Sequence, residues 1–532
     1  MTMETMECES KNTRLAYYPG PRGYPLIGNA LQIGRFPWIQ LAKWSEEYGP
    51  IYSAKLGPQY ALIVNSHRIA NELLDRRSAI YSDRPRMIML NEIMTQHLFL
   101  PTIPYGDSWR KLRKAISEVL NHRSIESFLP VVQRKMILLV ETLAKNPHDT
   151  KWMQDIIASI SMTAFALGYG DTPSQSSSDE DKSRRKEIED FMHRVERTAL
   201  PGEHLVELLP WLNRLPTWFP GMKWKTRGLE WHEKDTQMFE KLYKDAATAQ
   251  KEGKSSKSFV SITSKEYEAH EMNPGLDLTF KERAWMAGNL YGAGSSTTSA
   301  FALMFILAMV TNPQVMRKAQ AQIDEVVGRD RTPCLKDKDE LPYIRALLRE
   351  VFRWRSGSPL GVPHYSTEDG EYDGRFIPKG TLIMFNVWAM NREYPTFPDP
   401  DNFRPERFLD ETETKDYVPP HTHIDGHTTF GYGRRKCPGA MQANNILFIY
   451  ICTLLWTFDV LPVEGQEPSI NDFDDDNGMV LHPKPFPVKF VPRQSFEISL
   501  EKEANDMART RAKLGRKGDQ VHSKTFLAVI NG

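Results

Sequence analysis

The stretch of sequence that decides the fold reads Phe430-Gly431-Tyr432-Gly433-Arg434-Arg435-Lys436-Cys437-Pro438-Gly439. An apolar helical pattern follows it, so Cys437 stands at the start of a predicted helix, where backbone N–H groups and the helix dipole favour negative charge. Gly431 and Gly433 allow the backbone to turn tightly, and three basic side chains adjoin the cysteine. These features favour a thiolate, which is a strong metal ligand. The alternative is an inert buried cysteine, which this glycine-rich and cationic setting disfavours.

Composition restricts the classes of function that are open to the chain. The 532 residues are 40% hydrophobic, which is ample for a very large core. The 68 Lys and Arg residues balance the 68 Asp and Glu residues, and this zero net charge argues against nucleic acid as a partner. The four cysteines show no CxxC or other paired spacing, which argues against a disulfide scaffold or a thiolate zinc cluster.

The order of the secondary-structure patterns predicts a mainly α fold with a small β portion. Helical periodicity dominates from about residue 66 to about residue 349. Short alternating runs at 51–56 and 60–64 predict a hairpin, and strand signals return at about 375–385. We therefore expect one large helical domain (α+β) whose small sheet is assembled from both ends of the chain.

The two ends of the chain differ in composition from the part between them. Residues 1–18 form a polar segment in which no apolar stretch is long enough for a membrane anchor. Residues 19–495 form the predicted folded domain, and residues 496–532 form a charged extension. The longest apolar run, at 299–310, is predicted to be part of a core helix, so we expect no transmembrane anchor in this chain.

The cysteine segment resembles the haem-binding loop of the cytochrome P450 superfamily. The loop pattern, FxxGxRxCxG, is matched by Phe430, Gly433, Arg435, Cys437 and Gly439. The resemblance implies that these residues bind haem b, with Cys437 as the axial thiolate ligand of the iron and Arg435 paired with a propionate. It also implies that Phe430 packs beneath the porphyrin. A thiolate in this position pushes electron density onto the iron and favours cleavage of a bound O–O bond.

Two further motifs stand in the order that the family requires. Glu350 and Arg353 match its ExxR element, and residues 403–408 match its PERF element, which contains Arg407. Taken alone, a charged pair one helical turn apart is usually a surface salt bridge that contributes little to stability. The resemblance implies instead a buried cluster of Glu350, Arg353 and Arg407 with a structural role.

Three more residues match places where the family contacts the haem propionates. Trp109 and Arg113 form its WxxxR element, and His364 follows Pro363 ahead of a predicted strand. Each match is weak by itself, and an isolated histidine is more often structural. Their order along the chain makes Trp109, Arg113 and His364 candidate cofactor-binding residues.

A long helix predicted from Thr279 to Val310 contains the candidate oxygen-activating residues. The family pattern [AG]Gx[DE]T[TS] is matched at Ala293, Gly294, Thr297 and Thr298. Ser296 stands where the family has an acid, so the candidate catalytic residues are Thr297 and Ser296. A serine can only orient water or pass protons through it, so another donor elsewhere in the fold is an alternative source of protons. The small residues could also simply allow close helix packing.

The resemblance implies a monooxygenase that uses O2 and electrons from an NADPH-dependent flavoprotein reductase. Apolar residues dominate the segments expected to contact the substrate, at 88–104, 358–362 and 478–481, which predicts a hydrophobic small molecule. The overall likeness is to fungal microsomal members of secondary-metabolite pathways, with a terpenoid slightly ahead of polyketide or indole compounds. Two alternatives stay open: a haem-thiolate isomerase or dehydratase that needs neither O2 nor reductase, and a non-catalytic haem binder.

Residues 205–220 are unusually rich in apolar and aromatic side chains. Ordinary packing of short helices and a surface that dips into a bilayer account for them equally well. The second interpretation predicts peripheral membrane contact, and the expected location is the cytoplasm or the cytoplasmic face of the endoplasmic reticulum.

Overall fold

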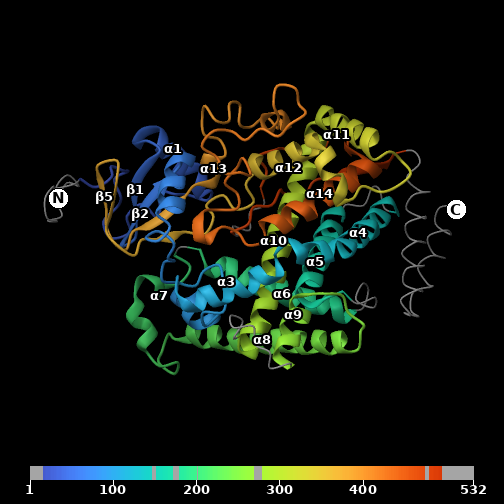
Figure 1. Ribbon diagram of the computed structural model, residues 1–532. Helices are drawn as coiled ribbons and strands as arrows, with labels where there is room; N and C mark the ends of the chain where they lie inside the picture. The colour runs from blue at the N-terminus through green and yellow to red at the C-terminus, as the bar shows by residue number, and fades with distance from the viewer. Residues whose placement is uncertain are drawn as a thin grey trace.

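The computed structural model describes residues 16–145, 151–171, 179–200, 202–268, 278–473 and 479–493. Over these residues the protein is mainly helical with three small sheets (Figure 1), which confirms the predicted fold class. Most of the segment predicted to be polar, 1–18, and the whole of the predicted extension, 496–532, lie outside the described residues.

The α-helices are α1 Pro37–Tyr48, α2 His67–Ala70, α3 Asp107–Val119, α4 His122–Lys145, α5 Trp152–Tyr169, α6 Asp179–Thr198, α7 Leu205–Leu208, α8 Lys223–Lys251, α9 Phe259–Glu268, α10 Phe280–Thr311, α11 Pro313–Val326, α12 Pro342–Trp354, α13 Val387–Met390 and α14 Ala440–Thr457. Short π and 3-10 segments are η1 Asn71–Arg76, η2 Ile88–Met94, η3 Pro210–Arg214, η4 Leu335–Glu340, η5 Pro405–Phe408 and η6 Gly433–Arg435. The strands are β1 Ile51–Leu56, β2 Gln59–Val64, β3 His364–Tyr365, β4 Gly370–Tyr372, β5 Arg375–Ile377, β6 Leu382–Phe385, β7 Phe458–Pro462 and β8 Val488–Pro492.

The largest sheet joins the two ends of the chain, as predicted. Strands β1 and β2 form the antiparallel hairpin, with Gly57 in the left-handed region at the turn. Strand β6 adds in parallel to β2, with Val64 opposite Phe385, and β3 pairs with the other edge of β6. The strand signal at 375–385 is split by a turn at Gly380, and its first part, β5, pairs with β4 in a separate two-stranded sheet.

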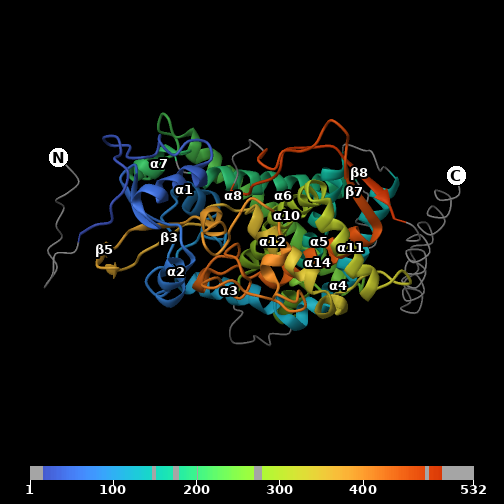
Figure 2. The same cartoon turned by 90° about the horizontal axis from the view of Figure 1, so that it is seen from above.

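Helix α10 runs through the middle of the helical part, between α5, α8 and α14 (Figures 1 and 2). A capping box begins it: the Glu282 N–H donates to the Thr279 hydroxyl at 3.2 Å, and the Thr279 N–H donates to the Glu282 carboxylate at 2.7 Å. The predicted helix from Thr279 to Val310 is therefore confirmed, with Thr279 as its N-cap. The helix is apolar on nearly every turn because the core surrounds it.

Two helices in the described part, α10 and α14, are long and apolar enough to span a bilayer. In each of them 78% of the apolar window is buried inside the protein. Burial by other helices explains this composition, so both belong to the core, as predicted for residues 299–310.

Candidate functional site

The loop before α14 holds Cys437 through backbone contacts that need glycine. Gly433 has φ +54°, and a Cβ there would lie 2.1 Å from the Leu74 carbonyl oxygen. Only glycine fits this left-handed position so close to another backbone segment. The Cys437 N–H donates to the Phe430 carbonyl at 2.8 Å, which closes the loop and turns the cysteine toward the start of α14.

The Cys437 sulfur accepts hydrogen bonds from the backbone N–H groups of Gly439 and Ala440. These bonds and the charges of Arg113 and Lys436 lower the pKa of the thiol, but burial outweighs them and raises the pKa overall. The side chain is nevertheless accessible to solvent. A bound metal ion would supply the remaining stabilisation of the thiolate.

The three basic side chains beside Cys437 do not all act on it, which corrects the sequence prediction. Arg434 is exposed and donates to the Tyr105 hydroxyl at 2.9 Å. Arg435 donates to two backbone carbonyls, so Lys436 is the one neighbour among the three that stabilises the thiolate. The second cation is Arg113, which comes from α3.

Arg435 is buried and keeps one nitrogen without a protein partner. Its Nε donates to the Ser82 carbonyl at 2.7 Å, and one Nη donates to the Ile103 carbonyl at 2.9 Å. The other, Nη1, is buried and makes no hydrogen bond within the part of the chain that the structure describes. Burial, with the charge of Arg113, lowers the pKa of Arg435 to about 10. A buried donor of this kind is costly unless an acceptor meets it.

A second buried arginine, Arg84, lies close enough to Arg435 for their charges to repel. Its guanidinium donates to the carbonyl oxygens of Pro101, Val362 and Pro363, at 2.9, 2.7 and 2.7 Å. Sequence reasoning missed Arg84 because nothing local distinguishes it from Arg86, which is largely exposed and pairs with Glu92.

His364 begins β3 and is fully buried beside these arginines. Its Nδ1 lies 2.6 Å from the Tyr81 carbonyl oxygen, and because a carbonyl only accepts, Nδ1 carries the proton. Burial and the charges of Arg84 and Arg435 hold the pKa of His364 well below its usual value. The ring is therefore neutral, and Nε2 is the atom left to meet a further partner.

Helix α3 brings the predicted WxxxR pair onto the cysteine loop. The Trp109 ring lies 4.6 Å from the Arg435 guanidinium and 6.0 Å from that of Arg113. Arg113 donates to the Lys436 carbonyl at 2.6 Å, directly before Cys437. The structure therefore gathers Trp109, Arg113 and Arg435 at the cysteine loop.

This donor set fits haem. Within the described residues, Arg84, Arg113 and Arg435 form no ion pair with a carboxylate, although Arg84 and Arg435 are buried and Arg113 is partly buried. The charge of Asp83 acts on Arg84 and Arg435, but its carboxylate accepts the backbone N–H groups of Arg84 and Tyr105, at 2.9 and 2.7 Å. Buried cations that no carboxylate pairs with directly are stabilised by an anionic ligand. Haem b would bring two propionate carboxylates to these arginines, and Cys437 would provide the sulfur ligand of its iron.

The small residues of α10 lie where part of the helix surface is exposed. Ala293 is exposed, and Gly294, Ser296 and Thr297 are partly exposed. The Thr297 hydroxyl donates to the Ala293 carbonyl at 2.8 Å, one turn back along the helix. Close helix packing also occurs, at Gly292, where Met192 of α6 lies against the backbone.

Ser296 has a partner that sequence reasoning did not identify. Its hydroxyl donates to the Glu196 carboxylate of α6 at 3.1 Å. The two residues are 100 positions apart, and no local pattern marks Glu196 among the charged residues of its helix.

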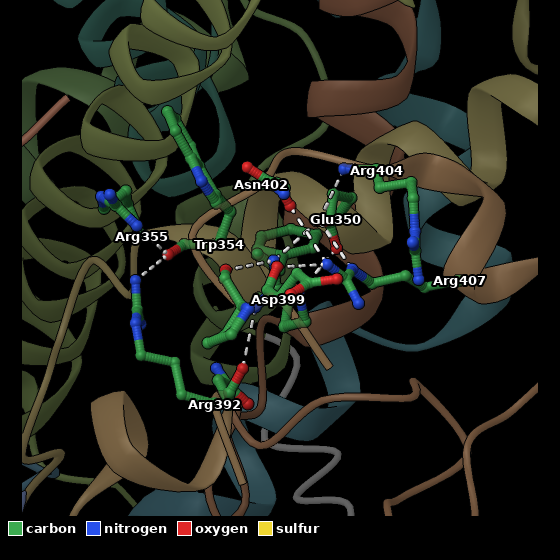
Figure 3. A network of polar contacts seen from close by, with 12 residues as sticks. Glu350, Trp354, Arg355, Arg392, Asp399, Asn402, Arg404 and Arg407 are labelled. Atoms are coloured by element: carbon green, nitrogen blue, oxygen red, sulfur yellow. Dashed lines mark hydrogen bonds and ion pairs between the residues drawn. The ribbon is translucent and has the colours of Figure 1, made fainter. Parts of the chain in front are cut away.

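The predicted Glu-Arg-Arg cluster is present and buried (Figure 3). Glu350 receives two hydrogen bonds from Arg353, at 2.6 and 2.7 Å, and Arg407 lies 3.4 Å from the same carboxylate. Arg353 also donates to the carbonyls of Asn391 and Pro400. The surface salt bridge was therefore the wrong alternative, and the cluster fastens α12 to the loops that lead to the cysteine segment.

The segments predicted to contact the substrate are tied to one another or to α10. The Asn289 side chain of α10 contacts the backbone of Leu98 and Leu100, at 3.1 Å each. The Ser358 hydroxyl donates to the Met479 carbonyl at 3.0 Å. Residue 478 lies outside the described residues.

Comparisons with known proteins agree with this site. The sequence model of the family described as Cytochrome P450 matches residues 18–490. Cytochrome P450 monooxygenase 58 of Postia placenta is 43% identical over 482 residues, which cover 89% of this chain and 88% of that protein. A cytochrome P450 monooxygenase of Armillaria gallica is 37% identical over 480 residues, covering 89% and 90%. Cytochrome P450 monooxygenase claR of Ampulloclitocybe clavipes is 34% identical over 491 residues, covering 90% and 86%.

Proposed function

The chain belongs to the cytochrome P450 family and is a monooxygenase of that type, and from this premise we propose its reaction and its partners. It inserts one oxygen atom of O2 into a hydrophobic small molecule and takes electrons from an NADPH-dependent flavoprotein reductase. The observation that supports this most strongly is the accessible Cys437 sulfur near the buried Arg435 guanidinium, whose Nη1 makes no hydrogen bond within the described residues.

The site residues divide into those that hold the cofactor and those that handle protons. Cys437 would bind the haem iron, Phe430 would pack against the ring, and Gly433 and Gly439 shape the loop. The propionates are bound by Trp109, Arg113, His364 and Arg435. Haem would supply the reduction and cleavage of O2, and Thr297 and Ser296 on α10 would pass the protons that this chemistry needs.

The proposed substrate is apolar and of moderate size. The segments around η2, at residues 358–362 and at 479–481, are rich in Met, Leu, Ile and Val. Apolar linings of this kind select ligands by shape and hydrophobic contact. A terpenoid of fungal secondary metabolism is the first candidate, ahead of polyketide and indole compounds, and the fungal origin of the relatives supports this setting.

Consumption of NADPH and O2 with a reconstituted fungal reductase tests the proposal. A monooxygenase consumes both, whereas an isomerase or dehydratase turns over its substrate without them and a non-catalytic haem binder does neither. Metabolite profiling of a host that expresses the chain beside its genomic neighbours then identifies the product. Haem-loaded protein that converts substrate without NADPH and O2 would contradict the proposal.

Removing the Thr297 hydroxyl is expected to uncouple the reaction. Thr297→Ala takes away the final hydroxyl of the proposed proton path and leaves the haem-binding residues untouched. NADPH consumption should continue while hydrogen peroxide rises and product falls, with haem content unchanged. The measurement is the ratio of hydrogen peroxide and of product to NADPH. Normal coupling in this variant would mean that protons arrive by another route.

An apolar patch at one end of the molecule supports peripheral membrane contact. Around α7 and η3, Trp218, Trp211 and Phe219 are 80%, 54% and 42% exposed. In the proline-rich lead-in, Leu26 is 95% exposed. The β1–β2 turn lies between these two groups. A Cβ added at Gly57 in this turn would lie 3.2 Å from the Leu208 side chain of α7. Gly28 of the lead-in forms an isolated β-bridge with Leu56 at the end of β1. Together they form one face that could enter the interfacial region of a bilayer.

The triple replacement of Trp211, Trp218 and Phe219 by Ser is expected to release the protein from membranes. The measurement is the fraction that sediments with liposomes of mixed neutral and anionic lipids. Tyr394→Ser is the matched control, because Tyr394 is 82% exposed and lies outside the patch. Wild-type protein that stays entirely in the supernatant would refute the proposal.

A further inference from the structure

The hydroxyl that replaces the family's acid on α10 is itself held by an acid. Ser296 donates to Glu196 at 3.1 Å, and Glu196 comes from α6, which lies beside α10 in both views (Figures 1 and 2). The family has an acid at the position of Ser296. In this chain the carboxyl group beside that position comes from a different helix, α6.

The packing of α6 on α10 fixes this contact. One turn before Ser296, a Cβ on Gly292 would lie 2.3 Å from the Met192 sulfur. The absence of a side chain at Gly292 thus lets Met192 sit against the α10 backbone. Met192 and Glu196 are four residues apart on α6, as Gly292 and Ser296 are on α10, so the two contacts are one helical turn apart on both helices.

The surroundings of Glu196 suit a group that exchanges protons. It is half-buried, and burial raises the pKa of its carboxyl, against the opposing effects of the Ser296 hydrogen bond and the charge of His193. A carboxyl so placed can hold and release a proton nearer neutral pH than a solvated one can. His193 lies one turn earlier on α6 and is exposed, so this side of the helix reaches solvent.

We propose that Glu196 is the acid of the proton relay, supplied by α6 in place of the missing acid on α10. Protons pass from solvent to Glu196, then to Ser296, and through ordered water to the Thr297 hydroxyl. This inference rests on the proposed monooxygenase function. In each turnover NADPH, O2, substrate and one proton give NADP+, hydroxylated substrate and water, so Glu196 takes back from solvent each proton that it passes on.

A substitution that removes the ionisable carboxyl group of Glu196 but keeps the shape of the side chain tests the relay. Glu196→Gln keeps an oxygen that can accept from Ser296, but it cannot carry a proton. Hydrogen peroxide formed per NADPH should rise several-fold and product should fall, with unchanged haem content and an unchanged substrate-induced spectral shift. Asp190→Asn, an exposed acid on the same helix, is the matched control and should match the wild type.

Moving the acid back to α10 provides a rescue that a merely structural role would not produce. In the double variant Glu196→Gln with Ser296→Asp, the carboxyl stands at residue 296, where the family pattern has it. Coupling should return toward the wild-type value. A double variant that is as uncoupled as Glu196→Gln alone, while still folded and haem-loaded, would overturn the relay.

A measurement without turnover examines the contact itself. Infrared difference spectra between the resting, haem-loaded wild type and Glu196→Gln should contain a carboxyl vibration of Glu196. The same vibration should shift in Ser296→Ala, because that variant removes the serine hydrogen bond to the carboxyl group. A vibration that Ser296→Ala leaves unmoved would contradict the proposal.

The remaining outcomes separate this inference from the proposed function. Weaker substrate binding with normal coupling in Glu196→Gln would make Glu196 a substrate-recognition residue and would overturn the relay alone. A wild-type enzyme that consumes neither NADPH nor O2 with an active reductase would overturn the monooxygenase proposal, and the relay with it.

Discussion

Glu350→Ala is expected to yield protein that no longer holds haem. Glu350 and Arg353 are fully buried and joined by two short hydrogen bonds, and Arg407 shares the same carboxylate. Removing the acid leaves two buried guanidinium groups without their counter-ion, at a cost on the order of 3–5 kcal/mol. That cost is a large part of the stability of an ordinary domain.

The measurements are haem bound per protein chain and the free energy of unfolding. Glu413→Ala is the matched control, because Glu413 pairs with Lys318 while both side chains are more than 40% exposed. Exposed pairs of this kind contribute less than about 1 kcal/mol, so the control should keep its haem. A stable Glu350→Ala variant with a full complement of haem would refute the structural role of the cluster.

The fold class and most of the cluster residues could be predicted because short motifs constrain them strongly. The FxxGxRxCxG loop requires Gly433 at a left-handed backbone position against Leu74, so the sequence pattern reflects a steric requirement. Glu350 and Arg353 are one turn apart on a single helix, which makes their pairing visible from spacing alone.

Contacts between distant segments could not be predicted in the same way. Glu196 meets Ser296 only because α6 crosses α10 closely at Gly292, and Arg84 meets Arg435 only because a loop folds back on the cysteine segment. The thiol environment shows a second limit. Adjacent basic residues in the sequence suggest a low pKa, whereas burial, which depends on the whole fold, raises the pKa of Cys437.

Cys437→Ala is expected to abolish monooxygenase turnover. The substitution removes the sulfur proposed to bind the iron and leaves the N–H groups of Gly439 and Ala440 without their acceptor. The propionate-binding side chains remain, so some haem binding should persist while no thiolate reaches the iron. Cys334→Ala is the matched control, because Cys334 is a partly exposed cysteine far along the chain from this loop, and its loss should leave turnover intact.

The carbon monoxide difference spectrum of the reduced protein tests the haem-thiolate assignment most directly. The wild type and Cys334→Ala should both show the strongly red-shifted Soret band that marks thiolate ligation, and Cys437→Ala should lack it. A Cys437→Ala protein that keeps this band would contradict the assignment of Cys437 as the axial ligand.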